Sequence, residues 1–398
     1  MKKIRSLLFL PILILFYGCQ FGGSKTTKTD DLHVVDISKI HPKKDIILQS
    51  IADIEYIPLE TTDDVLLSGV CQLAYISDKY VVVWEPRLYD IFIFDRNGKI
   101  ITHFNRKGAG NEEYLMIKNI IFDEKNEEIF VFDNPNMYRI LVYSIAGEYK
   151  RTIKYSDDFL RLSAYNFDDD AFLVYDESDM FKDLRKEKPY MLMSKNDGSI
   201  ISTLDISMSV RYSNRITEQV EVNGQTYYTP LSIFTPNNRY CGNNLLIADL
   251  SSDTIYFFTK NKELKPLIVR NPSVHSSEPR TVLTHQFSTD KFVFLYKIRL
   301  DFEAEKNNRS ITVTELMYEF TTRETSEVSF VNDDYPSRTW WIEPFMYADL
   351  PQNMYAMLIQ MSWLKKAAEE KQLKGELGDF VKALDVEDNP ILMIVKFK

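Results

Sequence analysis

The sequence lacks the residues and motifs on which most enzymatic chemistry depends. Among 398 residues there are only 5 His, and none of them lies at a spacing typical of metal ligands. No Gly-x-Ser-x-Gly motif for a nucleophilic serine is present. The sequence therefore predicts no catalytic residue, no metal site and no cofactor, and it favours binding over catalysis.

Cysteine is too scarce to form a disulfide framework. The chain has 3 Cys, and only Cys71 and Cys241 lie beyond the N-terminal segment. The repeat described below places these two far apart, so we expect free thiols, with Cys71 acting as a small buried hydrophobe. Glycine is also scarce, at 13 residues, whereas 44% of the chain is hydrophobic. This composition indicates a large ordered core.

Positive charge is in deficit as well. The 48 Lys and Arg are outnumbered by 58 Asp and Glu, which gives a formal net charge of −10. A chain with this balance repels polyanions unless a local basic patch intervenes. Nucleic acid is therefore not expected as a partner.

One long apolar run is present, at the N-terminus, and it is too short to span a membrane. Leu7 to Phe16 follows a basic segment and lies just before Cys19. This is the pattern of a signal peptide over residues 1–18, with Cys19 as the lipidated first residue. Ordinary secretion with a free Cys19 is the alternative. Residues 19–32 are then a flexible tether, and residues 33–398 form the folded domain.

A repeat of 147 − 98 = 49 residues organises that domain. A shift by this interval superimposes Gly98 on Gly147 and Tyr89 on Tyr138. Each unit holds four short runs rich in β-branched and aromatic residues, separated by turns. Four-strand units repeated at this period are typical of β-propeller blades.

Six such units account for the domain. The sixth has only three expected strands, and the solitary strand Ile54–Leu59 would complete it and leave no open sheet edge. We therefore predict an all-β, six-bladed β-propeller closed by an N-terminal strand that joins the C-terminal blade. The strands expected in that blade are Thr339–Glu343, Tyr355–Gln360 and Ile391–Phe397.

Three segments resemble a known family. Residues 57–60 (Ile-Pro-Leu-Glu), 108–114 (Gly-Ala-Gly-Asn-Glu-Glu-Tyr) and 388–390 (Asp-Asn-Pro) are similar to segments of six-bladed β-propeller lipoproteins common in Gram-negative gut bacteria. In the second segment the family usually shows a Gly-x-Gly-Pro-Gly-Glu-Tyr-like loop. The resemblance implies an exported protein, anchored to the cell envelope by lipid on Cys19, with the outer membrane as the expected location. It implies no reaction.

Four long insertions are expected on one face of the ring. Strands in a blade alternate in direction, so second-to-third loops and blade connections share the face opposite the other turns. Loops gathered on one face of a rigid scaffold usually form its binding surface, and the alternative is that they only pack on each other. Residues 361–384 are predicted to form a helix, broken at Gly375 and Gly378, that covers part of the channel mouth. The insertions are residues 176–189, 207–230, 299–311 and 361–390.

Aromatic and basic residues are the candidate ligand contacts. Trp and Tyr rings could stack on a sugar, although aromatics in propellers more often fill the core. Basic residues beside Gly108 and Gly110 could hold an anion, although a plain turn is the alternative. Residues 168–170, three consecutive Asp, lack the alternation of a calcium loop and are interpreted as a hairpin turn. The candidate residues are Arg106, Lys107, Tyr114, Tyr212, Tyr228, Trp340 and Trp363.

The function that the sequence favours is binding. We expect a lipid-anchored, monomeric, non-catalytic propeller that binds a glycan, a peptide or an envelope protein through its inserted-loop face. The competing hypothesis is an enzyme of the lyase, hydrolase or lactonase type with its active site at the channel mouth. The inner strands show no repeated His, Asp or Glu at their ends, which argues against an enzyme.

Overall fold

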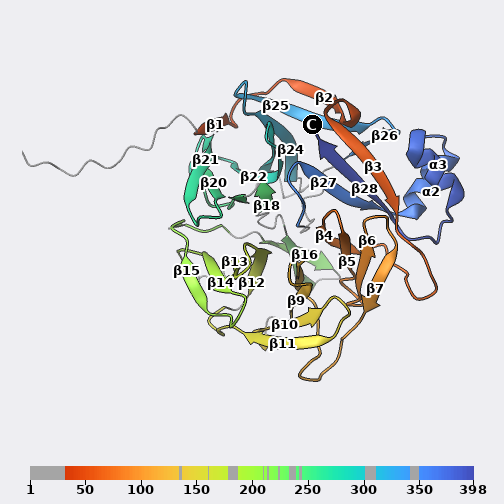
Figure 1. Cartoon of the computed structure of the whole chain (residues 1–398). Helices are drawn as coiled ribbons and strands as arrows, with labels where there is room; N and C mark the ends of the chain where they lie inside the picture. Colours follow the sequence, from red (N-terminus) through yellow and green to blue (C-terminus); the bar gives the residue numbers. More distant parts are fainter. Residues whose placement is uncertain are drawn as a thin grey trace, which may run out of the picture.

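Six sheets stand around one axis in the computed structural model, and Figure 1 shows them as the blades of a propeller. The predicted fold is therefore confirmed. The residues that the structure describes are 32–133, 137–159, 161–177, 187–208, 210–212, 215–222, 225–232, 239–241, 244–300, 311–340 and 349–398.

The first three blades are four-stranded, antiparallel and connected in up-and-down order. Their second strands are buried along their whole length, as in Tyr80–Trp84, because neighbouring blades cover both sheet faces. Continuous apolar runs thus replace the alternation of a half-exposed strand. The strands are β4 (Gln72–Ile76), β5 (Tyr80–Trp84), β6 (Ile91–Asp95) and β7 (Ile100–Phe104); β8 (Asn119–Asp123), β9 (Glu128–Phe132), β10 (Arg139–Ser144) and β11 (Tyr149–Lys154); β12 (Leu162–Asn166), β13 (Ala171–Asp176), β14 (Tyr190–Ser194) and β15 (Ile200–Thr203).

Blades four and five each gain an extra outer strand from the N-terminal segment. β1 (His33–Asp36) pairs in parallel with the outer strand of blade four, and β2 (Lys43–Ile47) pairs in parallel with that of blade five. Neither strand is predicted from the sequence. The other strands of these blades are β18 (Arg239–Cys241), β19 (Asn244–Ile247), β20 (Thr254–Phe258) and β21 (Leu264–Asn271), then β22 (Arg280–Ser288), β23 (Phe292–Leu300), β24 (Ile311–Glu319) and β25 (Glu324–Asn332).

The N-terminal segment also closes the ring, as predicted. After the short helix α1 (Leu48–Ile51), strand β3 (Ala52–Pro58) pairs antiparallel with β28 (Ile391–Phe397) along its whole length. β28 in turn pairs with β27 (Met354–Ile359). The last blade thus combines strands from both ends of the domain.

Asn389, in the loop before β28, stabilises this closure through side-chain hydrogen bonds. Its side-chain Nδ2 donates to the carbonyl oxygens of Glu60 and Val65 at 2.7 and 2.8 Å, and its Oδ1 accepts from the Leu67 amide at 2.7 Å. The side chain is buried, and all these partners lie just after β3. Two of the three family-like segments therefore meet where the ring closes.

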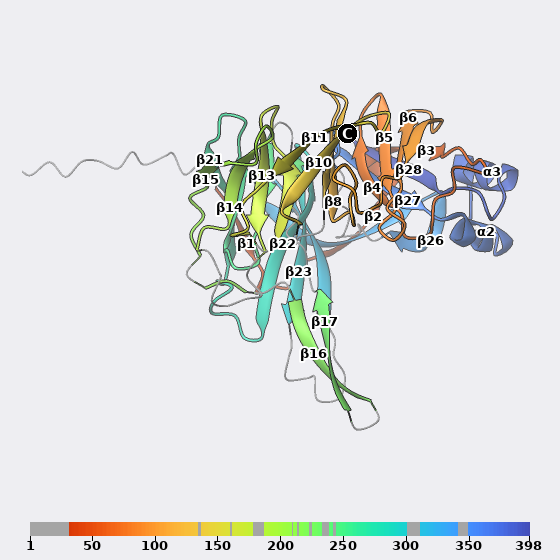
Figure 2. The same cartoon turned by 90° about the horizontal axis from the view of Figure 1, so that it is seen from below.

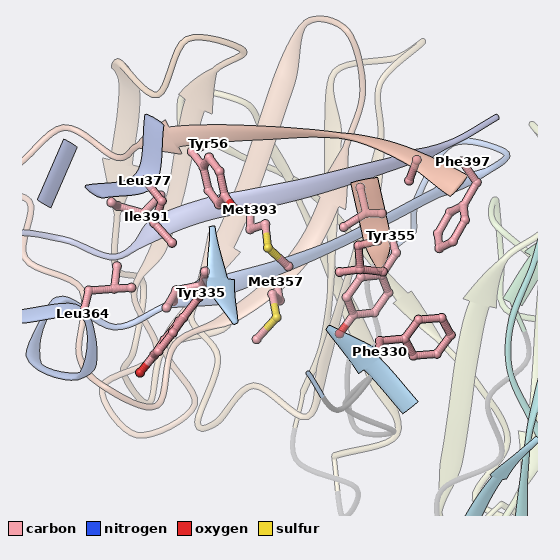
Figure 3. Packing of buried hydrophobic residues seen from close by; sticks show 14 of the residues in the cluster. Tyr56, Phe330, Tyr335, Tyr355, Met357, Leu364, Leu377, Ile391, Met393 and Phe397 are labelled. Atoms are coloured by element: carbon pink, nitrogen blue, oxygen red, sulfur yellow. The ribbon is translucent and has the colours of Figure 1, made fainter. Parts of the chain in front are cut away.

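A large hydrophobic cluster joins blades five and six (Figure 3). Tyr56 and Met393 come from the closing strands, and Phe330 comes from blade five. Helices α2 (Met361–Glu369) and α3 (Gly375–Ala383) contribute Leu364 and Leu377 to the same cluster. Each helix therefore buries its apolar side against the outside of the last blade.

The predicted position of this helical insertion is wrong. The helix is broken near Gly375, as expected, whereas the break predicted at Gly378 is wrong, because Gly378 lies inside α3. Figures 1 and 2 show both helices at the outer rim rather than over the channel mouth. The apolar stripe packs at the rim in the cluster that contains Tyr335 and Ile391. A periodic stripe predicts a helix that packs on something, but it does not identify the partner.

The first strand predicted for the last blade is also misassigned. β26 (Tyr335–Trp340) pairs with β25 of blade five, with Phe330 opposite Trp340. A tight turn joins these strands, in which Asn332 Oδ1 accepts from the Asp334 amide at 3.0 Å. Residues 341–343 of the predicted strand lie outside the described residues. Strand propensity alone could not choose between two adjacent blades.

The insertion between blades three and four contains a hairpin that leaves the disc. β16 (Arg215–Val222) and β17 (Gln225–Ser232) form a separate two-stranded sheet. Figure 2 shows this hairpin projecting from one side of the disc. The insertions thus include an element that extends well beyond the blades.

Candidate functional site

A cavity of about 670 Å³ opens at one end of the propeller axis, and we call it the axial pocket. Its walls are the ends of the inner strands β4, β8 and β12, the turns that follow them, and residues 349–352 before β27. Lys195 and Lys260, from third-to-fourth turns, complete the wall. All of these turns belong to one face of the disc, and the connection that carries the hairpin of β16 and β17 leaves from the other face.

A buried ion pair holds one side of the pocket. Lys195 Nζ lies 3.2 Å from Asp123 Oδ2, and the two residues are only 3% and 5% exposed. Asp123 also accepts hydrogen bonds from the amide and side chain of Asn126, at 3.2 and 3.1 Å. The Lys195 ammonium lies 5.6 and 5.5 Å from the ring centroids of Phe130 and Phe172. This pair therefore joins blades two and three.

Other carboxylates of the pocket are also engaged by the protein itself. Glu124 Oε2 accepts from the Tyr75 hydroxyl at 2.7 Å, and Asp169 pairs with Lys125. Burial raises the pKa of Tyr75, so its hydroxyl stays a donor. Asp168 Oδ1 accepts from the amide of Ala171 at 2.7 Å, as expected for a hairpin turn. These side chains build the wall.

Asp349 and Asn166 differ from these residues, because their side-chain oxygens accept few or no hydrogen bonds from the protein. The Asp349 backbone is fixed on β4 by hydrogen bonds with Ala74 and Ile76, at 2.8 and 3.1 Å. Its carboxyl receives one long contact, 3.5 Å from Asn166 Nδ2. The buried Asn166 Oδ1 has no hydrogen-bond partner among the described residues. Burial raises the pKa of Asp349 to about 6, against the opposing effects of Asn166 and Lys195.

The charge of the lining is negative. Six carboxyl side chains face the pocket against three lysines, and Tyr75, Phe122 and Phe167 add aromatic surface. Across the part of the chain that the structure describes, no three His, Cys, Asp or Glu side chains are grouped so as to hold a metal ion. The pocket is therefore built from carboxylates, amides and rings.

This site is not indicated by the sequence, and the prediction that the inner strands carry no repeated acidic residues at their ends is wrong. Asp123 ends β8, Asp168 follows β12, and Asp349 lies beside the end of β4. Asp123 and Asp168 stand at the start of turns, where an acidic side chain is ordinary, and Asp349 lies in an isolated bridge with Tyr75. Nothing in the local sequence separates a turn-forming Asp from one that faces the axis. The convergence of blades one, two, three and six supplies that information.

The loop that contains Arg106, Lys107 and Tyr114 lies between blades one and two and holds itself together. Tyr114 is fully buried, and its hydroxyl accepts from the Arg106 amide and donates to the Tyr89 carbonyl, both at 2.8 Å. The Gly110 amide donates to Glu113 Oε2 at 2.8 Å. The loop's own carboxylate thus sits where an external anion would bind.

The remaining candidate residues lie in other parts of the molecule. The ring of Tyr212 is covered by the Arg280 guanidinium at 3.8 Å, and its hydroxyl is 3.0 Å from His275 Nδ1. Trp363 is 47% exposed on α2, beside Tyr335. The structure does not bring these candidates together. Tyr228 lies in β17 and Trp340 in β26, but the structure describes neither side chain.

The prediction of free thiols is confirmed for Cys71, which is partly rather than fully buried, whereas Cys241 lies in β18 and its side chain is not described. Cys71 is a free thiol among the described residues, and burial raises its pKa to about 12. Such a thiol is unreactive at neutral pH. Cys19 lies outside the described residues, so its lipidation stays a prediction.

Three of the solved structures to which the chain is similar are distant from it in sequence. A protein described as exported, from Bacteroides fragilis NCTC 9343, is 14% identical, with a TM-score of 0.60 over 92% of this chain and 99% of that chain. A DUF4221 family member from Bacteroides vulgatus is 10% identical, with a TM-score of 0.42 over 87% and 97%. Virginiamycin B lyase from Staphylococcus aureus is 12% identical, with a TM-score of 0.33 over 69% and 98%.

A family model gives the clearest relationship. No curated protein matches the chain. None of the helices in the described part of the chain is long and apolar enough to cross a membrane. The model described as "Domain of unknown function (DUF4934)" matches residues 32–396, so the chain belongs to the DUF4934 family.

Proposed function

We propose that the protein is a non-catalytic binding propeller that holds a small polar ligand in the axial pocket. One observation carries the proposal: a cavity of about 670 Å³ is lined by Asp349 and Asn166, two residues whose side-chain acceptor atoms the protein leaves nearly unused. Buried polar atoms of a folded protein are usually hydrogen-bonded, and the exceptions often mark a missing partner. A ligand that donates hydrogen bonds would supply that partner.

The pocket favours binding over catalysis because several of its carboxylates are already engaged by the protein itself. Asp123 is neutralised by Lys195, and Glu124 accepts from Tyr75. Cleavage of a glycosidic bond, for example, usually requires two carboxyls with separate acid and base roles. Asp349 alone has the combination of burial and weak pairing that such a role requires. An enzyme of the lyase, hydrolase or lactonase type is the alternative.

The location proposed for this binding protein is the cell envelope. The N-terminal pattern that ends at Cys19 supports export and lipid anchoring, with the outer membrane as the site of the anchor. The Bacteroides structure described as exported supports export. Residues 19–32 would then hold a monomeric propeller near the membrane as a flexible tether.

A second binding surface is proposed on the inserted-loop face, for a glycan, a peptide or an envelope protein. The observation that favours it is the hairpin of β16 and β17, which forms its own two-stranded sheet away from the blades. An isolated two-stranded hairpin is marginally stable in water, so contact with a partner would stabilise it. If this is correct, removal of residues 215–232 abolishes capture of the partner and leaves pocket binding unchanged.

A ligand screen with a blocked pocket tests the main proposal. The chain from residue 20 onward is melted with a panel of small sugars, amino acids and short peptides. Lys260 is exposed on the pocket wall, so Lys260→Trp fills the mouth without disturbing the core. Lys39, an exposed residue outside the pocket, provides the control Lys39→Trp.

We expect at least one compound to raise the melting temperature of the native chain and of the Lys39→Trp variant, but not that of Lys260→Trp. A shift that persists in Lys260→Trp would place the ligand elsewhere. The proposal fails if no compound shifts the native chain. Mass spectrometry of the bound compound after incubation tests the enzyme alternative, since a non-catalytic protein returns it unchanged.

A further inference from the structure

The geometry of the axial pocket points to a chemical class of ligand: we propose that it selects small organic molecules with a free ammonium group, bound by Asp349 and Asn166. This inference rests on the proposed function, because it assumes that the pocket binds a ligand. It adds the group on the ligand that is recognised and the two side chains that recognise it.

The charge of the pocket favours a cation. Six carboxyls line it against three lysines, and two of those lysines are already paired, Lys195 with Asp123 and Lys125 with Asp169. The surplus of carboxylates adds to a formal net charge of −10 for the chain. A concave site with surplus negative charge raises the local concentration of cations and lowers that of anions.

The unused hydrogen-bonding atoms are acceptors rather than donors. Asn166 Oδ1 is buried without a partner among the described residues, and the Asp349 carboxyl beside it has only the 3.5 Å contact with Asn166 Nδ2. An ammonium group has three N–H donors and no acceptor, so it can donate to the Asp349 carboxylate and, once the Asn166 amide turns toward the pocket, to Asn166 Oδ1 as well. Its hydrogen bond to a carboxylate is charge-assisted and is roughly twice as strong as a neutral one.

The rest of the wall suits an organic cation better than a bare metal ion. Tyr75 and Phe122 pack edge to face with ring centroids 5.0 Å apart, and Phe167 lies on the same lining. Aromatic faces attract ammonium groups and cover the carbon skeleton that carries them. A metal ion would need several converging carboxylates, and no such group of three is found among the described residues.

Matched pairs of probes isolate the ammonium group. The native chain is titrated calorimetrically with glucosamine and N-acetylglucosamine, and with tri-alanine and its N-acetylated form. Each pair differs mainly in whether the nitrogen is charged. We expect the free amine of at least one pair to bind tenfold or more tightly than its acetylated partner.

Three variants then test the assignment of the two side chains. Asp349→Asn keeps the shape and removes the charge, so amine binding should weaken about tenfold while binding of the acetylated probe stays unchanged. Asn166→Asp adds a carboxylate and should strengthen amine binding, provided that its melting temperature shows a folded protein. Asp63→Asn, at an exposed position outside the pocket, is the control and should change neither.

The outcomes separate this inference from the proposed function. If an acetylated probe binds as tightly as its amine, the ammonium preference is overturned. If the binding of both probes is also lost in Lys260→Trp, the pocket nevertheless remains the binding site. Unchanged amine binding in Asp349→Asn would overturn the roles assigned to the side chains. If none of the probes binds the native chain, the ammonium preference is contradicted. If the ligand screen is negative as well, the proposed function is also contradicted.

Discussion

Three glycines show how single residues set the contacts between blades. Gly98, Gly147 and Gly198 occupy the third-to-fourth turns of blades one, two and three, with φ of +83°, +76° and +77°. A Cβ on each would collide with the outer strand of the preceding blade, for example with the Lys154 carbonyl at Gly198. Both the backbone conformation and the close approach of the next blade therefore require glycine.

This requirement predicts a large difference between two glycine substitutions. Gly198→Ala should reduce the free energy of unfolding by roughly 2 kcal/mol, because it adds strain at positive φ and a clash between blades. Gly69→Ala is the control, since nothing lies within 4 Å of the added methyl group. Urea denaturation of both variants measures the difference. Equal stability of the two variants would contradict this role of Gly198.

A buried carboxyl in blade five predicts a dependence of stability on pH. Burial raises the pKa of Glu315 to about 7, and its Oε2 has no hydrogen-bond partner among the described residues. Because the folded pKa lies above the unfolded value, the proton on Glu315 stabilises the fold at low pH. This contribution is lost as the pH rises through about 7.

Removal of the Glu315 carboxyl should therefore change the free energy of unfolding only at alkaline pH. Glu315→Gln is expected to raise the free energy of unfolding relative to the native chain by roughly 1 to 3 kcal/mol at pH 8.5. Near pH 4.5 the difference should nearly vanish. Urea denaturation at the two pH values measures it, with Glu112→Gln as an exposed control. A stabilisation of the same size at both pH values would exclude titration of Glu315 as its cause.

At the scale of elements, the N-terminal segment does more than its sequence indicates. Strands β1, β2 and β3 follow one another along the outer edges of blades four, five and six (Figure 1). The sequence predicted β3 because it is long and apolar and because the last blade lacked a strand. β1 and β2 are short, and β2 contains Lys43, Lys44 and Asp45, so their composition resembles that of the tether.

The packing of strand β1 predicts that substitutions at its neighbouring residues Val34 and Val35 differ in their effect on stability. Val35 is fully buried against blade four, whereas Val34 is 57% exposed. Val35→Asp would bury an unpaired carboxyl and should destabilise the domain by about 3 kcal/mol. Val34→Asp should change the stability by less than about 0.5 kcal/mol. Thermal and urea unfolding measure both, and similar losses would show that β1 does not pack as the structure has it.

The helices α2 and α3 were predictable from the sequence, but the surface on which they pack was not. Leu364 and Leu377 share an apolar stripe that is visible in the sequence, and Gly375 with φ of +57° marks the break between the helices. Their docking on the rim depends on Tyr335 and Ile391, which come from two other parts of the chain. Sequence periodicity gives the face that will be buried, but contacts between distant segments give its location.

At the scale of the whole molecule, the blade number and the closure were predictable for a physical reason. A 49-residue repeat defines the unit, and a blade with one strand too few needs a strand from elsewhere. The pocket was not predictable in this way. Asp349, Asn166 and Glu124 belong to different blades, and only the closed ring brings them to one end of the axis.

The two faces of the disc are consequently different. The face with the short turns holds the axial pocket with its surplus of carboxylates. The other face carries the hairpin of β16 and β17. The two proposed binding surfaces therefore lie on opposite faces, the small-ligand pocket at the axis and the partner surface at the hairpin.

A crystal structure of the native chain, grown with the amine that binds most tightly in the titrations, tests ligand binding in the axial pocket most directly. We expect density for the amine inside the pocket, with its nitrogen about 2.7 to 3.0 Å from the Asp349 carboxylate. Density for the amine at another surface, or an empty axial pocket at a saturating concentration, would contradict the proposed site.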